Sequence, residues 1–230
     1  MPDIRAVNLC KTFHFNGQSK NVLNGISLDV NQGDFILITG PSGSGKTTFL
    51  MTLGGLITPD DGKVYFDKNN FYQASEVQRN MIRAKLISYI FQNNILVNNL
   101  NVLENILFPF QIKGDINKEI LKKVSSLIDY FGIRDLAVKK ISKLSGGEQQ
   151  VVNFIRGVIP QSPILLVDEP TSEVDLALNR KILEYLKKMN HENNISIVLV
   201  SHDPMAEKAA REIYRMQSGK FVDYRENSIL

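Results

Sequence analysis

Cysteine, net charge and long apolar runs are all scarce in this chain of 230 residues. Its one cysteine, Cys10, cannot form an internal disulfide, and the sequence has no Cys/His cluster with the spacing of a metal site. A reducing cytosol is therefore the expected setting. The first residues, MPDIRAVNLCKTF, mix charged with apolar residues, so we expect no export signal there.

The apolar runs are too short to cross a membrane. Stretches such as ILLV fall far below the roughly 18 consecutive apolar residues that a span requires. If the protein acts at a membrane, we expect another chain to supply the membrane part. The formal net charge of +3 is too small to indicate nucleic acid as a partner, so none is expected. Lysine pairs, such as Lys122 with Lys123 and Lys139 with Lys140, are expected on solvated helix faces, of which an acidic membrane surface could make modest use.

Four short apolar runs end in polar residues. FILIT precedes Gly40, LISYIF precedes Gln92, ILLV precedes Asp168, and ISIVLV precedes Ser201 and His202. Runs of this length, rich in Ile, Val and Leu, are typical of strands that are buried on both faces in a parallel sheet. Helical patterns lie between them. The sequence therefore predicts an α/β fold with its site at the carboxyl ends of the strands.

Two regions depart from this alternation. The segments VLNGISLDVNQGD and PDDGKVYFD predict an antiparallel side sheet, with Asp61 and Gly62 forming a hairpin-type turn. Residues 93–144 are mostly helical in pattern and predict an inserted helical lobe, in which Pro109 should kink or end its helix and Gly114 marks a loop. The two apolar helix faces consist of Val102, Leu103, Ile106, Leu107 and Phe110, and of Leu121, Val124, Leu127, Ile128 and Phe131.

The segment GPSGSGKT follows the first strand and precedes a helical pattern. Its residues are Gly40, Pro41, Ser42, Gly43, Ser44, Gly45, Lys46 and Thr47, followed by Thr48. The glycines allow the backbone N–H groups to point inward, and the helix start adds a dipole that favours anions. The spacing predicts a phosphate loop in which Lys46 bridges the terminal phosphates and the Thr47 hydroxyl binds Mg²⁺. An ordinary glycine-rich turn would not require Lys followed by Thr.

Two acids, Asp168 and Glu169, directly follow the strand ILLV. Because Mg²⁺ prefers oxygen ligands and keeps much of its water shell, Asp168 is expected to hold a metal-bound water. Glu169 is expected to orient and deprotonate the water that attacks the γ-phosphate. The alternative is that the two acids merely close a strand before Pro170, which is a weak explanation in a chain that also has a phosphate loop.

His202 follows another predicted strand, which places it level with the two acids. An imidazole there can reach the γ-phosphate or the attacking water. On spacing alone, a surface histidine that begins a helix with Asp203 and Pro204 remains an open alternative. His14 and His191 have no comparable context and are expected at the surface.

A second phosphate-binding pattern, LSGGEQQ, begins at Leu144. Ser145, Gly146 and Gly147 offer a hydroxyl and backbone donors at the start of a helix from about Glu148, complementary to a γ-phosphate. The alternative is an ordinary Ser-capped helix start.

These segments, in this order, resemble the nucleotide-binding subunit of ATP-binding cassette (ABC) transporters over nearly the whole chain. GPSGSGKT resembles the Walker A loop, the glutamine of YIFQ the Q-loop, LSGGE the signature motif and ILLVDEP the Walker B motif. SEVD, ending at Asp175, resembles the D-loop, and His202 the switch histidine. The resemblance implies an ATPase with a P-loop NTPase core of mainly parallel sheet, an antiparallel side sheet and an inserted helical subdomain. Within this single domain, residues 1–92 and 158–230 would form the core and side sheet, and about 93–157 the helical subdomain with the signature helix.

The resemblance also explains why the chain has a second phosphate-binding pattern at LSGGEQQ. In the family, the signature of one subunit closes over ATP held by the other, so two cassettes bury two nucleotides. The expected ligands are therefore ATP and Mg²⁺, bound in an ATP-dependent homodimer that is weak or transient without nucleotide. Residues expected to bind nucleotide across that interface are Ser145, Gly146, Gly147 and Asp175.

Two further roles follow from the resemblance. Gln92 would sense the attacking water and bind the metal with Thr47 and Asp168, linking the nucleotide site to the helical lobe. Phe13 stands where the family carries an aromatic residue that stacks on adenine, and an aromatic ring keeps that surface without a tyrosine hydroxyl. Phe15 could serve instead, and either side chain could simply pack in the side sheet.

The family works with an integral membrane permease subunit, which is here expected to be encoded separately. The ATPase itself would be cytoplasmic and peripheral on the inner face of the cell membrane. The stretch NNILVNNLNVLENILFPF lies where coupling helices of such a subunit dock in the family, although ordinary packing in the lobe explains it equally well. This stretch and LSGGEQQ most resemble the lipoprotein-release, macrolide-export and cell-division group.

Other cassette and nucleotide-binding proteins fit less well. A DNA-maintenance ATPase would need a long coiled-coil insertion, a translation-factor type would carry two cassettes, and a GTPase would need Asp after Asn117 and Lys118. A cassette that regulates a membrane partner without sustained transport remains open. Val151 stands where the family usually has Arg, which removes a charge and its donors from the signature helix. We therefore expect a closed dimer that is less firmly fixed or differently packed.

Overall fold

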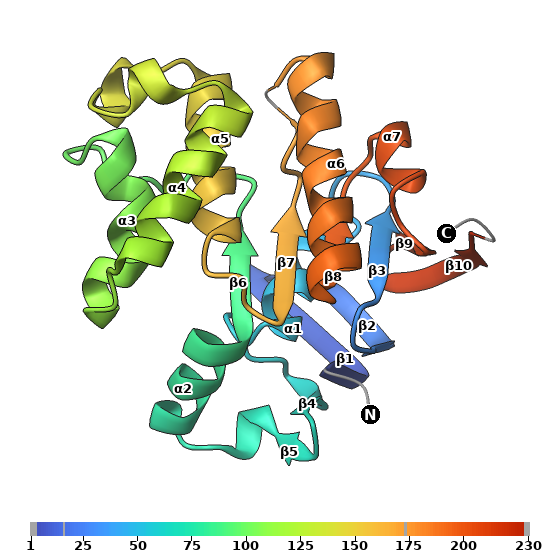
Figure 1. Ribbon diagram of the computed structural model, residues 1–230. Helices are drawn as coiled ribbons and strands as arrows, with labels where there is room; N and C mark the ends of the chain where they lie inside the picture. Colours follow the sequence, from blue (N-terminus) through green and yellow to red (C-terminus); the bar gives the residue numbers. More distant parts are fainter. Residues whose placement is uncertain (1–3, 16, 173, 228–230) are drawn as a thin grey trace.

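The main sheet of the computed structural model, which describes residues 4–15, 17–172 and 174–227, has six strands in the order β10-β9-β3-β8-β7-β6. Its members are β3 (Phe35–Thr39), β6 (Ile87–Ile90), β7 (Ile164–Asp168), β8 (Ser196–Val200), β9 (Glu212–Gln217) and β10 (Lys220–Glu226). The pairs from β9 to β6 are parallel, and only the edge strand β10 runs antiparallel to its neighbour. The four apolar runs of the sequence are thus confirmed as neighbouring parallel strands whose carboxyl ends point the same way (Figure 1).

Strands β7 and β8, in the interior of the main sheet, are buried at every position because most of their residues are apolar. In β7, Leu165 and Val167 belong to one hydrophobic cluster, whereas Ile164 and Leu166 belong to the other. Helix α1 (Lys46–Leu53) packs in the second cluster, while α6 (Leu176–Asn193) packs in the first. The alternation of side chains along each strand therefore gives each face of the sheet its own core.

A smaller antiparallel sheet, also as predicted, has the order β2-β1-β4-β5. It consists of β1 (Ile4–Phe15), β2 (Gln18–Val30), β4 (Asp61–Phe66) and β5 (Asn69–Asn70). The predicted turn at Asp61 and Gly62 is wrong, because both residues belong to β4 and Asp61 lies opposite Cys10. Gly62 has φ +96°, and a Cβ there would lie 2.5 Å from the carbonyl oxygen of Asn8. The glycine thus marks an irregular, close strand pairing and not a turn.

A helical subdomain lies beyond the β6 edge of the main sheet (Figure 1). It contains α3 (Val102–Lys113), α4 (Lys118–Phe131) and α5 (Gly146–Val158), with short 3₁₀ turns at Arg134–Leu136 and Ile141–Lys143. Pro109 does not end its helix, which continues to Lys113 and ends at the left-handed Gly114. Helix α5 begins at Gly146, two residues before the predicted start at Glu148. Of the two predicted apolar faces, only Leu121 is exposed, at 46%.

The remaining helices are α2 (Glu76–Leu86), which precedes β6, a 3₁₀ turn at Phe71–Gln73, and the single turn α7 (Pro204–Glu207). Within residues 4–15, 17–172 and 174–227, no helix combines the length and hydropathy needed to cross a bilayer.

Candidate active site

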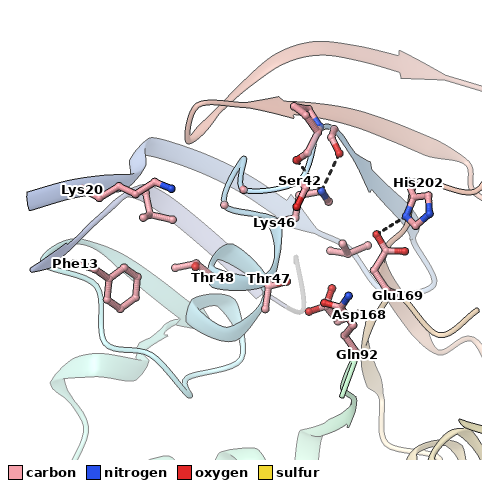
Figure 2. A pocket seen from close by; sticks show the side chains of 16 residues that line it. Phe13, Lys20, Ser42, Lys46, Thr47, Thr48, Gln92, Asp168, Glu169 and His202 are labelled. Carbon is pink, nitrogen blue, oxygen red and sulfur yellow. Dashed lines mark hydrogen bonds and ion pairs between the residues drawn. The ribbon is translucent and has the colours of Figure 1, made fainter. Parts of the chain in front are cut away.

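A cleft of ≈ 640 Å³ lies where β3, β6, β7 and β8 end, a volume within the usual range for small-molecule sites (Figure 2). Its walls come from the side sheet, the phosphate loop and the residues that follow the central strands. The lining residues are Phe13, Lys20, Val22, Gly40, Pro41, Ser42, Gly43, Gly45, Lys46, Thr47, Thr48, Gln92, Asp168, Glu169, Val200 and His202. The fold therefore brings together most of the site residues predicted from the sequence.

The phosphate loop has a backbone that requires glycine. Gly40, Gly43 and Gly45 have φ values of +139°, +75° and +105°. A Cβ at Gly40 would lie 2.0 Å from the carbonyl oxygen of Met216, so no other residue fits there without movement. The Lys46 side chain is folded back under the loop, and its Nζ donates to the carbonyl oxygens of Gly40 at 2.8 Å and Pro41 at 3.1 Å. Because an ammonium group has three donors, this arrangement fixes the charge at the loop and leaves a donor for a phosphate.

Asp168 is almost completely buried at the end of β7, with 3% of its surface exposed. Burial raises the pKa of its carboxyl group, and the negative charge of Glu169 raises it further, whereas the Thr47 hydroxyl and the Lys46 charge lower it. Within the described residues, its Oδ1 atom has no hydrogen-bond partner. A buried carboxylate oxygen with no partner costs free energy, and a bound cation would remove that cost.

Glu169 is held in an unusual backbone conformation beside His202. Its φ is +45°, in the left-handed region, and its N–H donates to the carbonyl of Val200 at 2.9 Å. Its Oε1 lies 2.9 Å from Nδ1 of His202, so a charged Glu169 accepts a hydrogen bond from that nitrogen. Its Oε2 is buried and has no partner in the part of the chain that the structure describes. One oxygen is therefore oriented, and the other is left for a ligand of the cleft.

Gln92 and Phe13 enter the cleft from different sides. Gln92 follows β6 and lies near Asp168 and Thr47, whereas Phe13 lies in β1 near Lys20 (Figure 2). Phe13 is 41% exposed, and the Nζ of Lys11 lies 5.6 Å from its ring centroid. Phe13 thus presents a ring to the cleft, while Phe15, which is 76% exposed, is not part of the lining.

Three comparisons with known proteins agree on the relatives of this chain. Residues 23–172 match the family model described as ABC transporter. The chain belongs to the ABC transporter family. The lipoprotein-releasing system ATP-binding protein LolD of Acinetobacter baylyi is 32% identical over 96% of this chain and 97% of its own length. The macrolide export ATP-binding/permease protein MacB of Syntrophobacter fumaroxidans is 34% identical over 94% of this chain, which covers 30% of that longer protein.

Among solved structures, a dimeric ATP-binding cassette in a post-hydrolysis state with ADP and Pi superposes with a TM-score of 0.91. It is 30% identical, and the match covers 99% of this chain and 100% of that one. The fold predicted from the sequence, a P-loop NTPase core with a side sheet and a helical subdomain, is thereby confirmed, as is the resemblance to the lipoprotein-release and macrolide-export group. The chain is an ATP-binding cassette and an ATPase.

Several predicted site residues of the cassette lie outside the cleft. The described lining does not include Ser44, whose Oγ is buried, nor Ser145, Gly146, Gly147 or Asp175. Ser145 caps α5, since its Oγ accepts from the Glu148 N–H at 3.3 Å, as in the alternative that the sequence left open. Asp175 caps α6 through the Leu178 N–H at 2.8 Å, and Glu173 of the SEVD segment lies outside the described residues. In one copy of the chain, Ser145, Gly146, Gly147 and Asp175 thus lie at helix starts and not in the cleft.

Sequence reasoning missed Lys20 and Val22, which line the cleft from β2. No motif marks them, but Lys20 lies directly opposite Phe13 in the pairing of β1 with β2. The register of this hairpin was therefore the only available signal. Val151 of α5, which stands where the family usually has arginine, is 2% exposed and packs in the hydrophobic core.

Proposed function

We propose that two copies of this chain sandwich two ATP molecules and that hydrolysis drives a separately encoded integral membrane subunit. The observation that carries the proposal is the convergence of Lys46, Asp168 and Glu169 on one cleft, with buried carboxylate oxygens that lack protein partners among the described residues. Such groups are expensive to maintain unless a ligand satisfies them. A phosphate loop opposite them supplies the chemistry of that ligand, a nucleotide polyphosphate with a cation.

The residues that we propose for Mg²⁺ are Thr47, Asp168 and Gln92. A hydroxyl, a carboxylate and an amide oxygen are hard ligands of the type that Mg²⁺ prefers, and phosphate oxygens and water would complete the shell. The described chain has no cluster of three or more His, Cys, Asp or Glu side chains that could hold a metal without such help. Bound there, Mg²⁺ would neutralise charge that develops on the phosphate oxygens.

Glu169 is the proposed general base. Its Oε1 is oriented by His202, so its Oε2 is the atom that would take a proton from the attacking water. His202, exposed at the cleft mouth, would orient Glu169 and contact the γ-phosphate. Phe13 would stack on the adenine ring. The signature residues Ser145, Gly146 and Gly147, with Asp175, would reach the nucleotide of the second copy.

The membrane partner is supported by what the surface exposes. Ile95, just after Gln92, is 57% exposed, and Val77 and Met81 of α2 are 63% and 65% exposed. We propose that a permease subunit contacts these three side chains, since burying them in an interface would remove apolar surface from water. The cassette would then be cytoplasmic and peripheral on the inner face of the cell membrane. We place it with the relatives named for lipoprotein release and macrolide export.

The substitution Glu169→Gln tests this function. We expect ATP binding to remain, hydrolysis to fall at least about 100-fold, and an ATP-bound dimer to accumulate, because the base is lost and the shape is kept. Hydrolysis is measured as phosphate release and dimerisation by sedimentation with and without ATP. Turnover at the wild-type rate would exclude Glu169 as the base. Co-purification of the membrane subunit, with stimulation of turnover by it and its substrate, would separate a motor from a purely regulatory cassette.

A further inference from the structure

Residues 91–101, which include Gln92, connect β6 to α3 without regular secondary structure apart from a single bridge at Asn101. The backbone polar groups of such a segment need partners from elsewhere in the fold. Several of those partners are side chains of the helical subdomain. The segment is therefore tied to α5 and α3 by specific hydrogen bonds.

Two side chains of α5 hold the backbone on either side of Gln92. Asn153 is 2% exposed, and its Nδ2 donates to the carbonyl of Phe91 at 3.0 Å. Arg156 donates from Nη2 to the carbonyl of Ile95 and, at 3.4 Å, to Oδ1 of Asn153. The carbonyl immediately before Gln92 and another three residues after it are thus bonded to one helix.

A second buried asparagine fixes the far end of the segment. Asn105 of α3 is 0% exposed, accepts from the Val97 N–H at 2.8 Å and donates to the Val97 carbonyl at 3.1 Å. Buried amides that are satisfied in this way specify one backbone arrangement, since any other leaves polar groups unpaired. Gln92 therefore extends from a segment that is anchored on both sides.

The bond from Asn153 depends on a close approach of α5 to β6. A Cβ at Gly157 would lie 2.4 Å from Cγ1 of Ile90 and 3.0 Å from the carbonyl oxygen of Tyr89. Glycine at this position lets the helix lie against the end of β6, and Asn153, one turn earlier on the same face, then reaches Phe91.

The same helix also contacts the segment that follows the catalytic acids. Gln150 is 0% exposed, and its Nε2 donates to the carbonyl of Pro170 at 3.0 Å. Gln150, Asn153 and Gly157 have the i, i+3, i+7 spacing of one helix face. This face of α5, the helix capped by Ser145, thus touches the backbone next to both Gln92 and Glu169.

We infer that Asn153 is a positioning residue for Gln92: its hydrogen bond to Phe91 transmits the position of α5 to the nucleotide site. The inference rests on the proposed role of Gln92 in hydrolysis. A side chain at 153 without a donor leaves the Phe91 carbonyl unpaired, and Gln92 is then no longer fixed relative to the phosphate loop. We expect the affinity for ATP without Mg²⁺ to stay unchanged, because the phosphate loop and Phe13 remain in place.

A double-mutant cycle tests the inference, with turnover at saturating ATP and Mg²⁺ measured for wild type, Asn153→Ala, Gln92→Ala and the double variant. We expect Asn153→Ala to lower kcat about 5–10-fold, the effect of one misplaced hydrogen bond, with unchanged affinity for ATP measured without Mg²⁺. In the Gln92→Ala background, the same change should have less than about a twofold effect, because its target is gone. Asn153→Asp, which keeps the shape but cannot donate, should lower kcat at least as much as Asn153→Ala.

Asn190→Ala is the matched control. Asn190 of α6 donates to the carbonyls of Gly33 at 2.8 Å and Ile195 at 2.9 Å, before β3 and β8 begin. It should lower the melting temperature without lowering kcat. An unchanged kcat in Asn153→Ala, or equal fold losses with and without Gln92, would overturn the inference and leave the proposed function intact. Wild-type turnover in Gln92→Ala would instead remove the role of Gln92 and the inference with it.

Discussion

The cassette has two helix N-termini with a phosphate-binding sequence pattern, at α1 and at α5. They differ in which groups accept hydrogen bonds from their first backbone N–H groups. The helix α1 begins after Gly45, and within the described structure no side chain accepts from its first N–H groups as a cap. The helix α5 begins after Ser145, which forms a reciprocal capping box with Glu148. The first start depends on a ligand for its donors, whereas the second is partly satisfied by its own sequence.

The two helix N-termini also differ in burial and in the charged groups around them. Lys46 is buried and lies in one cleft with Asp168 and Glu169. Ser145 is exposed and outside the described lining of that cleft. On the proposed function, one copy of the chain therefore holds the phosphate loop of one nucleotide site and the signature residues of another. The comparison teaches that the fold of one copy gathers the phosphate loop and the acids in one cleft, whereas Ser145 lies outside that cleft and, on our proposal, meets a nucleotide only when a second copy supplies it.

The largest expected effect concerns the phosphate loop. Lys46→Ala removes the charge at the phosphate loop, and we expect ATP affinity to fall at least about 100-fold, or ~2.7 kcal/mol. Calorimetric titration with ATP measures it. Lys20→Ala is the control, since Lys20 lines the same cleft near Phe13, and it should change affinity by less than about threefold. Equal affinities for wild type and Lys46→Ala would mean that this start does not grip phosphate.

The next largest effect concerns the signature residue Ser145. Ser145→Asp keeps a good helix cap but places a negative charge where the second copy would bring its γ-phosphate. In the Glu169→Gln background, we expect ATP binding to persist while the ATP-driven dimer weakens at least about tenfold, measured by sedimentation. Ser75→Asp at the equivalent capping box of α2 is the control and should leave the dimer intact. A dimer that survives Ser145→Asp would show that the two starts do not meet across an interface.

The comparison also explains which parts of the fold and site the sequence could predict. The phosphate loop and the pair Asp168 and Glu169 are each encoded by a few consecutive residues. Their patterns could therefore be recognised in the sequence before the fold was known. Parallel strands place their carboxyl ends at one edge, and that rule alone brings Gln92 and His202 to the same cleft.

Features that depend on distant pairings could not be predicted in this way. Gly62 has the sequence signal of a turn, but its partner strand β1 makes it part of an irregular strand pairing. Lys20 reaches the cleft through its register opposite Phe13. No motif in the sequence marks Asn153, and its bond to Phe91 forms where Gly157 allows α5 to approach β6.

The smallest expected effect is a change in thermal stability when the buried carboxylate of Asp168 is removed. Because burial raises the pKa of Asp168, the folded state binds a proton there more readily than the unfolded chain does. Its charge therefore reduces stability as pH rises above the ordinary aspartate pKa of 3.8, the value from which this carboxyl is shifted. With metal chelated at pH 7, Asp168→Asn should melt about 2–4 °C higher than wild type, and the gain should shrink as pH falls towards that value.

Glu148→Gln, in the first turn of α5, is the control. Hydrogen bonds from Ser145 lower the pKa of Glu148, so this change should not raise the melting temperature. If calorimetry showed Asp168→Asn melting lower than wild type at pH 7, the buried Asp168 carboxylate would not destabilise the ligand-free cassette, contrary to our argument.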